Sequence, residues 1–300
     1  MSIFTGSGVA LSTPFTKSNE FDASAYERLI EFQIKEGTAA LVPCGTTGES
    51  ATLTADEHIE VVKTAVAAAK KYGAKYSRKV PVIAGAGGNN TANCIAMGKA
   101  LQATGADAIM CVTPYYNKTS QKGLLAHYTE IATQVDLPIM VYNVPVRTSL
   151  NMLPTTLQEL GKLPNIVAVK EASSDIDQIA ETIERCGADM DIYVGNDSQI
   201  LPVLALGGRG VVSTMGNIAP GIIQGIVDLF FAGKLDEARV QQLSILPMIR
   251  LLFSDVNPMP VKAALNIMDF DMGLCRLPLV DVSDTLKADL TAEMKRIGIL

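Results

Sequence analysis

The sequence contains no tryptophan and only two histidines, His58 and His127, among its 300 residues. This scarcity weakens any mechanism that needs several histidine ligands or a Ser-His-Asp triad. Both histidines lie within helical patterns, so we expect them to be ordinary surface or capping side chains. We therefore expect a reaction that uses neither a metal nor another cofactor.

Cysteine spacing and charge exclude further classes of protein. The five cysteines are odd in number and never form a C-x-x-C pair, which is typical of reduced thiols rather than of a disulfide framework or a zinc site. The 25 Lys and Arg residues are outnumbered by 31 Asp and Glu residues, and no basic run occurs, so we expect no nucleic-acid partner. No signal-peptide pattern or membrane-spanning apolar run is found. We expect a soluble cytoplasmic protein without a membrane partner.

Short apolar runs rich in β-branched residues alternate with longer amphipathic stretches. The expected strands are residues 8–13, 39–43, 80–85, 108–114, 138–145, 166–172, 192–197 and 210–216. One stretch between them opens at Thr54 with Glu57 three residues later, the spacing of a helix capping box. Strict alternation implies parallel strands joined by crossover helices. Eight such units in about 230 residues fit a (β/α)8 TIM barrel, with a doubly wound open sheet as the alternative.

The strand pattern stops after Gly233, and the remaining segments have helical periodicity. The expected helices are residues 234–252, 260–268 and 283–297. We therefore predict a barrel over residues 1–233 and a C-terminal helical domain over residues 234–300. Active sites of (β/α)8 barrels lie at the C-terminal ends of the strands, so the residues that end each run are the candidates for function.

The second expected strand ends in a turn that carries two hydroxyl side chains between glycines. Thr46 and Thr47, together with the backbone N–H groups of such a turn, suit a small anion such as a carboxylate. The alternative is a structural turn whose hydroxyl caps the next helix. We expect Cys44 to be a small buried residue, because no histidine lies nearby to activate it.

Tyrosines follow the fourth and fifth expected strands. Tyr115 and Tyr116 point in different directions, so at most one enters a given pocket, and loop packing is the alternative. Alternation places Met140 and Tyr142 on one face, and if that face is the barrel axis, the Tyr142 hydroxyl can donate a proton at the mouth. Arg147 follows a proline-containing loop and its planar guanidinium suits a carboxylate, although a surface ion pair would use the same residue.

The sixth expected strand is an apolar run that ends in a lysine. Alternation places Ile166, Ala168 and Lys170 on one face and turns Glu171 to the other, so Glu171 is a poor partner for Lys170. Burial disfavours the ammonium form of a lysine, and only the neutral amine attacks a carbonyl to form a Schiff base. An inward lysine, a tyrosine on the adjacent strand, a hydroxyl-rich turn and an arginine together suit an α-keto acid substrate.

These residues lie in motifs that resemble the dihydrodipicolinate synthase family. The resembling segments are residues 45–50, 113–117, 142–148, 169–173, 257–265 and 276–279. N-acetylneuraminate lyases and keto-sugar-acid aldolases are related and share the lysine and the tyrosine. The tandem Thr46-Thr47 and Arg147 make the sequence more similar to the synthases.

The resemblance implies condensation of pyruvate with aspartate 4-semialdehyde in diaminopimelate and lysine biosynthesis. It implies a Schiff base on Lys170 and a proton relay of Thr46, Tyr142 and Tyr116, with Tyr116 reaching across a subunit interface. It also implies a homo-oligomer, as a dimer of dimers. The implied substrate-binding residues are Thr47 for the pyruvate carboxylate, Arg147 for the semialdehyde carboxylate, and Gly195 and Val212 in the pocket wall.

The family also has members that lysine inhibits. The residues that match the lysine-binding positions are Ser50, Ala51, His58, Asn89 and Tyr115. Lysine-sensitive relatives tend to carry His and Glu where this sequence has Ala55 and Asn93, so we expect weak or absent inhibition.

Two alternatives to the synthase are a lyase that cleaves a keto-sugar acid and a catalytically silent barrel that serves as a binding protein.

Overall fold

The computed structural model describes residues 2–300 and contains one closed ring of parallel strands. The strands are β1 (Gly6–Ala10), β2 (Ala40–Val42), β3 (Ile83–Gly85), β4 (Ala108–Val112), β5 (Ile139–Asn143), β6 (Ile166–Glu171), β7 (Asp191–Val194) and β8 (Gly210–Ser213). Their order is β2-β1-β8-β7-β6-β5-β4-β3. A parallel bridge between Leu41 and Val82 joins the two ends of this sheet. The predicted barrel is confirmed, and the open sheet is wrong.

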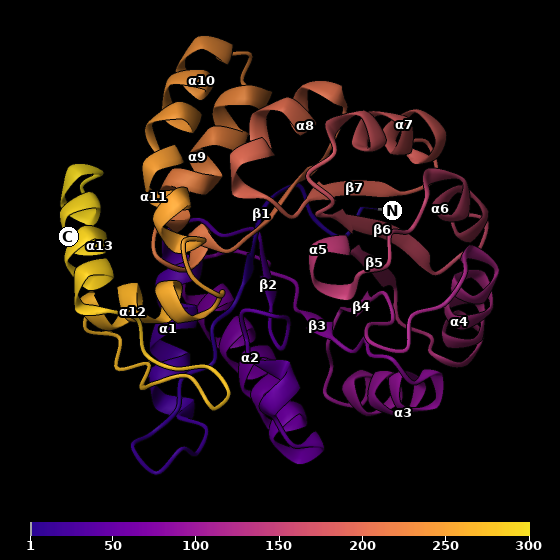
Figure 1. Ribbon diagram of the computed structural model, residues 1–300, viewed down its shortest axis with the longest axis horizontal. Helices are drawn as coiled ribbons and strands as arrows, with labels where there is room; N and C mark the ends of the chain where they lie inside the picture. The colour runs from indigo at the N-terminus through magenta and orange to yellow at the C-terminus, as the bar shows by residue number, and fades with distance from the viewer. Residues whose placement is uncertain (1) are drawn as a thin grey trace.

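Helices surround this ring, and the C-terminal ones lie together (Figure 1). The helices around the barrel are α1 (Ala23–Lys35), α2 (Ala55–Lys75), α3 (Thr91–Gln102), α4 (Gln121–Gln134), α5 (Pro145–Thr148), α6 (Pro154–Leu160), α7 (Ile176–Cys186), α8 (Ile200–Leu206) and α9 (Pro220–Phe231), with 3₁₀ turns at Ser50–Thr52, Asp197–Gln199 and Met215–Asn217. The C-terminal helices are α10 (Leu235–Ser244), α11 (Leu246–Leu252), α12 (Met259–Ile267) and α13 (Asp284–Arg296). Figure 1 shows α9 to α13 on one side of the barrel, next to α1. Within residues 2–300, no helix combines the length and the apolar character needed to cross a membrane.

Most of the predicted elements are confirmed, with shifts at their ends. The capping box is present: the Thr54 hydroxyl accepts from the Glu57 N–H, and the Glu57 carboxylate accepts from the Thr54 N–H. The expected helix over residues 234–252 is two helices, because Pro247 lies in the first turn of α11 and favours a new helix start there. The division into two domains at residue 233 stays a prediction.

Strand alternation creates two separate apolar clusters. The cluster inside the barrel, here called the interior cluster, consists of Phe4, Ala10, Ala40, Val42, Ile83, Ala108, Met110, Met140, Tyr142, Val144, Ala168, Ala172, Tyr193 and Val212. A larger outer cluster lies between the strands and the helices. The expectation that Ile166 shares a face with Ala168 is wrong. The pairing register shifts between Ile139 and Met140, so Ile166 joins the outer cluster while Val167 and Ala168 both pack against the interior one.

The two histidines are buried, so the expectation of surface or capping histidines is wrong. His58 Nε2 lies 2.7 Å from the Gly85 carbonyl oxygen, and His127 Nδ1 lies 2.9 Å from the Thr91 hydroxyl. His58 faces strand β3 and His127 faces helix α3, and burial at these positions lowers the pKa of each imidazole. The five cysteines are free, and Cys44 is buried as expected.

A buried ion pair links the turn after β2 to α12. Lys262 Nζ lies 2.7 Å from Glu49 Oε1, and both side chains are almost completely excluded from solvent. Lys262 also donates to the Leu274 carbonyl and lies 4.2 Å from the centre of the Phe15 ring, while Glu49 Oε2 accepts from the Arg276 N–H. Burial lowers the pKa of Lys262, and the Glu49 carboxylate opposes that shift. Each of the two charged side chains can therefore remain buried only because the opposite charge lies beside it.

Removing one member of this pair is expected to cost far more stability than replacing both. Lys262→Ala leaves the Glu49 carboxylate buried without a cation, which costs about 3–5 kcal/mol. The double variant Glu49→Gln/Lys262→Met removes both charges at similar volume and should recover most of that loss. Urea unfolding of the three proteins measures both effects, and equal destabilisation by the single and double variants would contradict this account.

Candidate active site

Lys170 and Tyr142 lie side by side inside the barrel. Parallel pairing of β5 with β6 places Tyr142 opposite Lys170. The Lys170 Nζ lies 4.3 Å from the centre of the Tyr142 ring, and Lys170 is only 6 % exposed. The face of the Tyr142 ring therefore lies over the Lys170 amine, so the two candidate side chains are in contact inside the barrel.

Glu171 faces the helices and forms a polar network there, as strand alternation predicts. Its carboxylate accepts from Asn143 Nδ2 at 3.0 and 3.2 Å and from the Ser173 N–H at 2.8 Å, with Gln178 Nε2 at 3.5 Å. Burial raises the pKa of the Glu171 carboxyl, against the opposing effect of these hydrogen bonds. Because Asn143 and Glu171 directly follow Tyr142 and Lys170, this network links the ends of the two strands that carry the candidate pair.

Gly195 lies next to the Lys170 side chain, and Val212 packs inside the barrel. A Cβ atom at Gly195 would lie 2.6 Å from the Ala172 Cβ and 3.1 Å from the Lys170 Cε, so a larger residue would push against the lysine side chain. Val212, on β8, is fully buried in the interior cluster. Both predicted pocket residues thus belong to the barrel interior, and Gly195 directly contacts the space that Lys170 occupies.

The turn after β2 presents hydroxyl and backbone donors beside a cavity. Cys44 and Glu49, at either end of the turn, have left-handed backbones with φ of 56° and 54°. Within residues 2–300, the backbone N–H groups of Thr46 and Thr47 donate to no protein acceptor. Thr47 is buried and its hydroxyl accepts from Asn257 Nδ2 at 3.0 Å. Unpaired donors of this kind suit an anion.

A cavity of about 800 Å³ opens at the C-terminal ends of the strands. Thr46, Tyr142 and Arg147 are among its lining residues. Four of the predicted residues are not among its lining residues: Thr47, Lys170, Gly195 and Val212. The Lys170 amine lies against the ring of Tyr142, which does line the cavity. The wall also includes all five positions predicted for lysine binding, which are Ser50, Ala51, His58, Asn89 and Tyr115, together with Ala55 and Asn93. The cavity lined by Thr46, Tyr142 and Arg147 therefore extends to the predicted lysine site.

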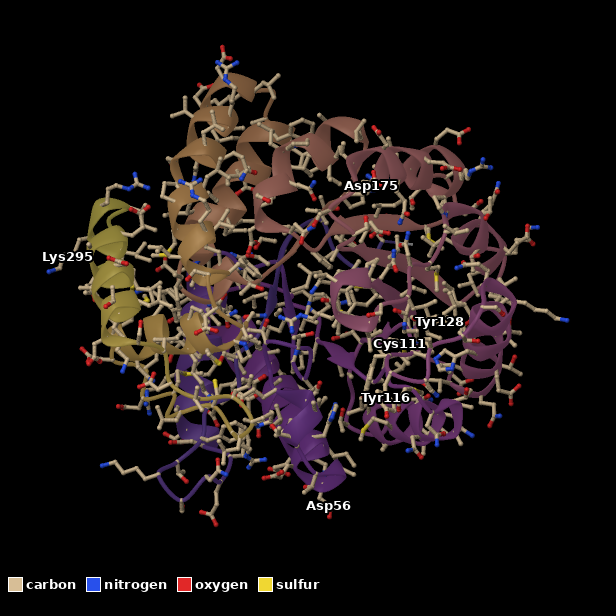
Figure 2. The ribbon with its side chains drawn as sticks, viewed as in Figure 1. Asp56, Cys111, Tyr116, Tyr128, Asp175 and Lys295 are labelled. Atoms are coloured by element: carbon tan, nitrogen blue, oxygen red, sulfur yellow. The ribbon has the colours of Figure 1, made fainter. Side chains whose placement is uncertain are left out.

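Arg147 and Tyr116 are the exposed members of the predicted set. Arg147 forms no ion pair within residues 2–300, and its Nη2 donates to the Asn257 carbonyl at 3.3 Å. Tyr116 is 92 % exposed on the loop after β4, with a left-handed backbone, and does not line the cavity of its own chain, whereas Tyr115 does. Figure 2 shows Tyr116 on the side of the molecule where α3 lies.

Sequence reasoning missed two buried polar residues near this centre. Asp197, after β7, accepts from the N–H groups of Thr214 and Met215 at 3.2 and 2.9 Å, and its other oxygen has no partner in the described chain. Burial raises the pKa of Asp197, and the charge of Lys170 opposes that shift. Asn257 touches both Thr47 and Arg147. Asp197 ends an expected strand, so it could have been chosen as a candidate from the sequence. Asn257 lies outside the barrel elements, and no such signal marks it.

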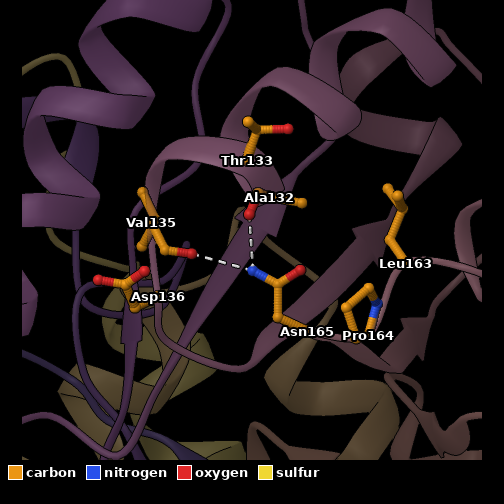
Figure 3. Close-up of a pocket in the computed structure, with 7 residues that line it drawn as sticks. All are labelled: Ala132, Thr133, Val135, Asp136, Leu163, Pro164 and Asn165. Carbon is orange, nitrogen blue, oxygen red and sulfur yellow. Dashed lines mark hydrogen bonds between the residues drawn. The ribbon is translucent and has the colours of Figure 1, made fainter.

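A second, smaller pocket lies at the opposite end of the strands. It has a volume of about 370 Å³ between the end of α4 and the segment before β6 (Figure 3). There Asn165 Nδ2 donates to the Ala132 and Val135 carbonyls, both at 2.9 Å. These bonds satisfy carbonyl groups at the end of a helix, and Asn165 therefore has a structural role.

The chain is similar over its whole length to proteins of one family. Residues 3–297 match the Dihydrodipicolinate synthetase family. The 4-hydroxy-tetrahydrodipicolinate synthase of Lachnoclostridium phytofermentans is 49% identical over 301 residues, covering 100% of both chains. The DHDPS of Cyanidioschyzon merolae, solved with lysine bound, has a TM-score of 0.95 at 37% identity and covers 100% of each chain.

A third relative is the dihydrodipicolinate synthase of Acinetobacter baumannii, solved in complex with pyruvate. It has a TM-score of 0.94 at 36% identity and covers 99% of each chain. These matches confirm the predicted fold, the predicted class of enzyme, a Schiff-base-forming lyase that acts on pyruvate, and the predicted activity, 4-hydroxy-tetrahydrodipicolinate synthesis. The silent-barrel alternative is not supported. This chain belongs to the dihydrodipicolinate synthetase family.

Proposed function

We propose that Lys170 forms a Schiff base with pyruvate and that the resulting enamine condenses with L-aspartate 4-semialdehyde. The observation that carries this assignment is the Lys170 amine 4.3 Å from the centre of the Tyr142 ring, because Tyr142 lines the same cavity as Thr46 and Arg147. In this mechanism, Lys170 is the one protein side chain that acts as a nucleophile. We propose a cytoplasmic location, in keeping with the biosynthetic reaction that the curated relatives' name describes.

The first half of the reaction takes place on pyruvate. The neutral Lys170 amine attacks C2, and loss of water gives the imine. The pyruvate carboxylate is held by Thr47 and by the unpaired N–H groups of its turn. The protonated imine then acidifies C3, and transfer of a C3 proton to the relay of Tyr142, Thr46 and Tyr116 gives the enamine. The absence of a side chain at Gly195 leaves room for this adduct.

The second half joins the two substrates. The enamine C3 attacks the aldehyde carbon of the semialdehyde, a new C–C bond forms, and the aldehyde oxygen takes up a proton from the relay of Tyr142, Thr46 and Tyr116. Arg147 binds the semialdehyde carboxylate. The amine of the semialdehyde then attacks the imine carbon, which closes the ring and frees Lys170. The net change is the loss of one water.

The exposure of Tyr116 supports an oligomeric enzyme. A tyrosine that is 92 % exposed in a strained backbone has no evident role within its own chain. We propose that Tyr116 enters the site of a partner subunit and that the complete assembly is a dimer of dimers. Each active site would then be completed by a second copy of this chain.

Borohydride reduction in the presence of pyruvate is expected to trap the imine on the peptide that contains Lys170. Lys170→Ala should lose almost all turnover and form no adduct while remaining folded by circular dichroism. Lys162→Ala is the control, since it removes an exposed lysine that does not line the cavity. Mass analysis of the digested protein locates the adduct, and an adduct elsewhere or normal turnover of Lys170→Ala would overturn the mechanism.

Mixing two inactive variants tests the proposed position of Tyr116. Tyr116→Phe should reduce kcat by about a hundredfold, as expected for a lost proton-transfer group. In a mixed oligomer with Lys170→Ala, the site that keeps Lys170 receives an intact Tyr116 from its partner, so activity should return. Steady-state assays after co-refolding measure this recovery. No recovery in verified mixed oligomers would show that Tyr116 acts within its own chain.

Lysine is expected to inhibit this enzyme weakly or not at all. Ala55 presents a methyl group and Asn93 a neutral amide to the cavity, so neither supplies a charge-assisted bond to the ligand. The double variant Ala55→His/Asn93→Glu should increase lysine sensitivity by about tenfold or more, the effect of one or two such bonds. Inhibition curves for both proteins measure the difference. Strong inhibition of the unaltered enzyme at low lysine would refute the expectation.

A further inference from the structure

The segment before and within α12 contacts the turn after β2 at two points. Asn257 Nδ2 donates to the Thr47 hydroxyl at 3.0 Å, and Lys262 Nζ lies 2.7 Å from the Glu49 carboxylate. Thr47 and Glu49 belong to the same turn, two residues apart. The C-terminal part of the chain therefore determines the position of the loop that we assign to pyruvate.

Asn257 touches both groups that we assign to substrate carboxylates. Its side chain contacts Thr47, and its backbone carbonyl accepts from Arg147 Nη2 at 3.3 Å. The residue is 6 % exposed, and its Oδ1 has no hydrogen-bond partner within residues 2–300. The bond from Nδ2 to Thr47 is therefore the one hydrogen bond that this side chain makes within residues 2–300.

The bond from Asn257 determines which way the Thr47 hydroxyl can donate. A hydroxyl has one hydrogen, which rotates toward the best acceptor, and lone pairs that accept. Because Nδ2 already donates to the Thr47 oxygen, the hydroxyl hydrogen points away from Asn257. No acceptor for it is found within residues 2–300. A carboxylate that binds at the turn is therefore met by a donor that is already oriented.

We propose that Asn257 is a positioning residue for the synthase reaction: it orients the Thr47 hydroxyl as a donor to the pyruvate carboxylate. Asn257 acts through Thr47 and does not itself touch the substrate. This inference rests on the proposed role of Thr47. It assigns a function to the segment at residues 257–265, which the barrel residues alone do not explain.

A purely structural role for Asn257 is the competing explanation. The Glu49–Lys262 pair and the bond from the Thr13 hydroxyl to the Gly48 carbonyl, 2.8 Å long, already link the turn to its surroundings. The turn thus keeps its fold without the Asn257 amide. The loss of that amide should change pyruvate binding more than it changes stability.

Two variants of Asn257 distinguish these explanations by which of them raises the KM for pyruvate more. Asn257→Asp keeps the shape, but its carboxylate only accepts, so it turns the Thr47 hydrogen away from pyruvate and adds a negative charge. Asn257→Ala merely frees the hydroxyl to rotate. The KM for pyruvate should rise about threefold in Asn257→Ala and about thirtyfold or more in Asn257→Asp, since one hydrogen bond to a charged group accounts for a factor of this size. The KM for the semialdehyde should change less than about twofold, because Arg147 bonds to the backbone.

The same variants in a Thr47→Val background complete the test. Without the hydroxyl, Asn257→Ala should have no further effect on the KM for pyruvate. If Thr47→Val itself leaves that KM unchanged, the proposed role of Thr47 fails. If Thr47→Val raises the KM for pyruvate, two results would overturn the inference about Asn257 alone. One is an increase in this KM in Asn257→Ala as large as that in Asn257→Asp. The other is an effect of Asn257→Ala on this KM that persists in the Thr47→Val background. The midpoints of urea unfolding show whether each variant is folded. If Asn257→Asp does not fold, the comparison of Asn257→Ala with and without Thr47→Val is sufficient for the test.

Discussion

The buried pair of Glu49 and Lys262 is the interaction on which the candidate site depends most. It connects the turn that follows the second strand with a helix more than two hundred residues later, and it does so in the core. Two buried charges are stable only when they stay close together and fully hydrogen-bonded. The requirement for contact therefore fixes the distance between the turn and α12 within narrow limits. Thr47 lies in that turn and Asn257 lies just before α12, so their hydrogen bond follows from the same constraint.

A second constraint acts between the strands that carry Tyr142 and Lys170. The residues after them, Asn143 and Glu171, hydrogen-bond to each other on the opposite face. Inside the barrel, the amine and the aromatic ring are thereby held against each other without any direct hydrogen bond between them. Polar contacts that face the helices thus determine the geometry of groups that face the axis.

Periodic features could be predicted from the sequence, and contacts between distant segments could not. The eight strands, and the placement of Lys170 with Ala168 and of Tyr142 with Met140 on one face, follow from alternation, which depends only on neighbouring residues. The burial of His58 depends on how α2 rotates against the barrel, and helical periodicity in one sequence does not determine it. Asn257 carries no local pattern that points to Thr47. Its role depends on the packing of α12 against a turn that lies far away in the chain.

The extra residue in β6 has a consequence for the evolution of this site. Because Val167 and Ala168 both face the interior, the number of residues between the start of the strand and Lys170 determines on which side the lysine emerges. Insertion or deletion of a single residue between Ala168 and Lys170 would turn the amine toward the helices and bring Glu171 or Val169 to the axis. A substitution in this strand changes one side chain, whereas a change in its length reverses the faces of all the residues that follow. The number of residues that precede Lys170 in β6 is therefore as necessary to the active site as the lysine itself.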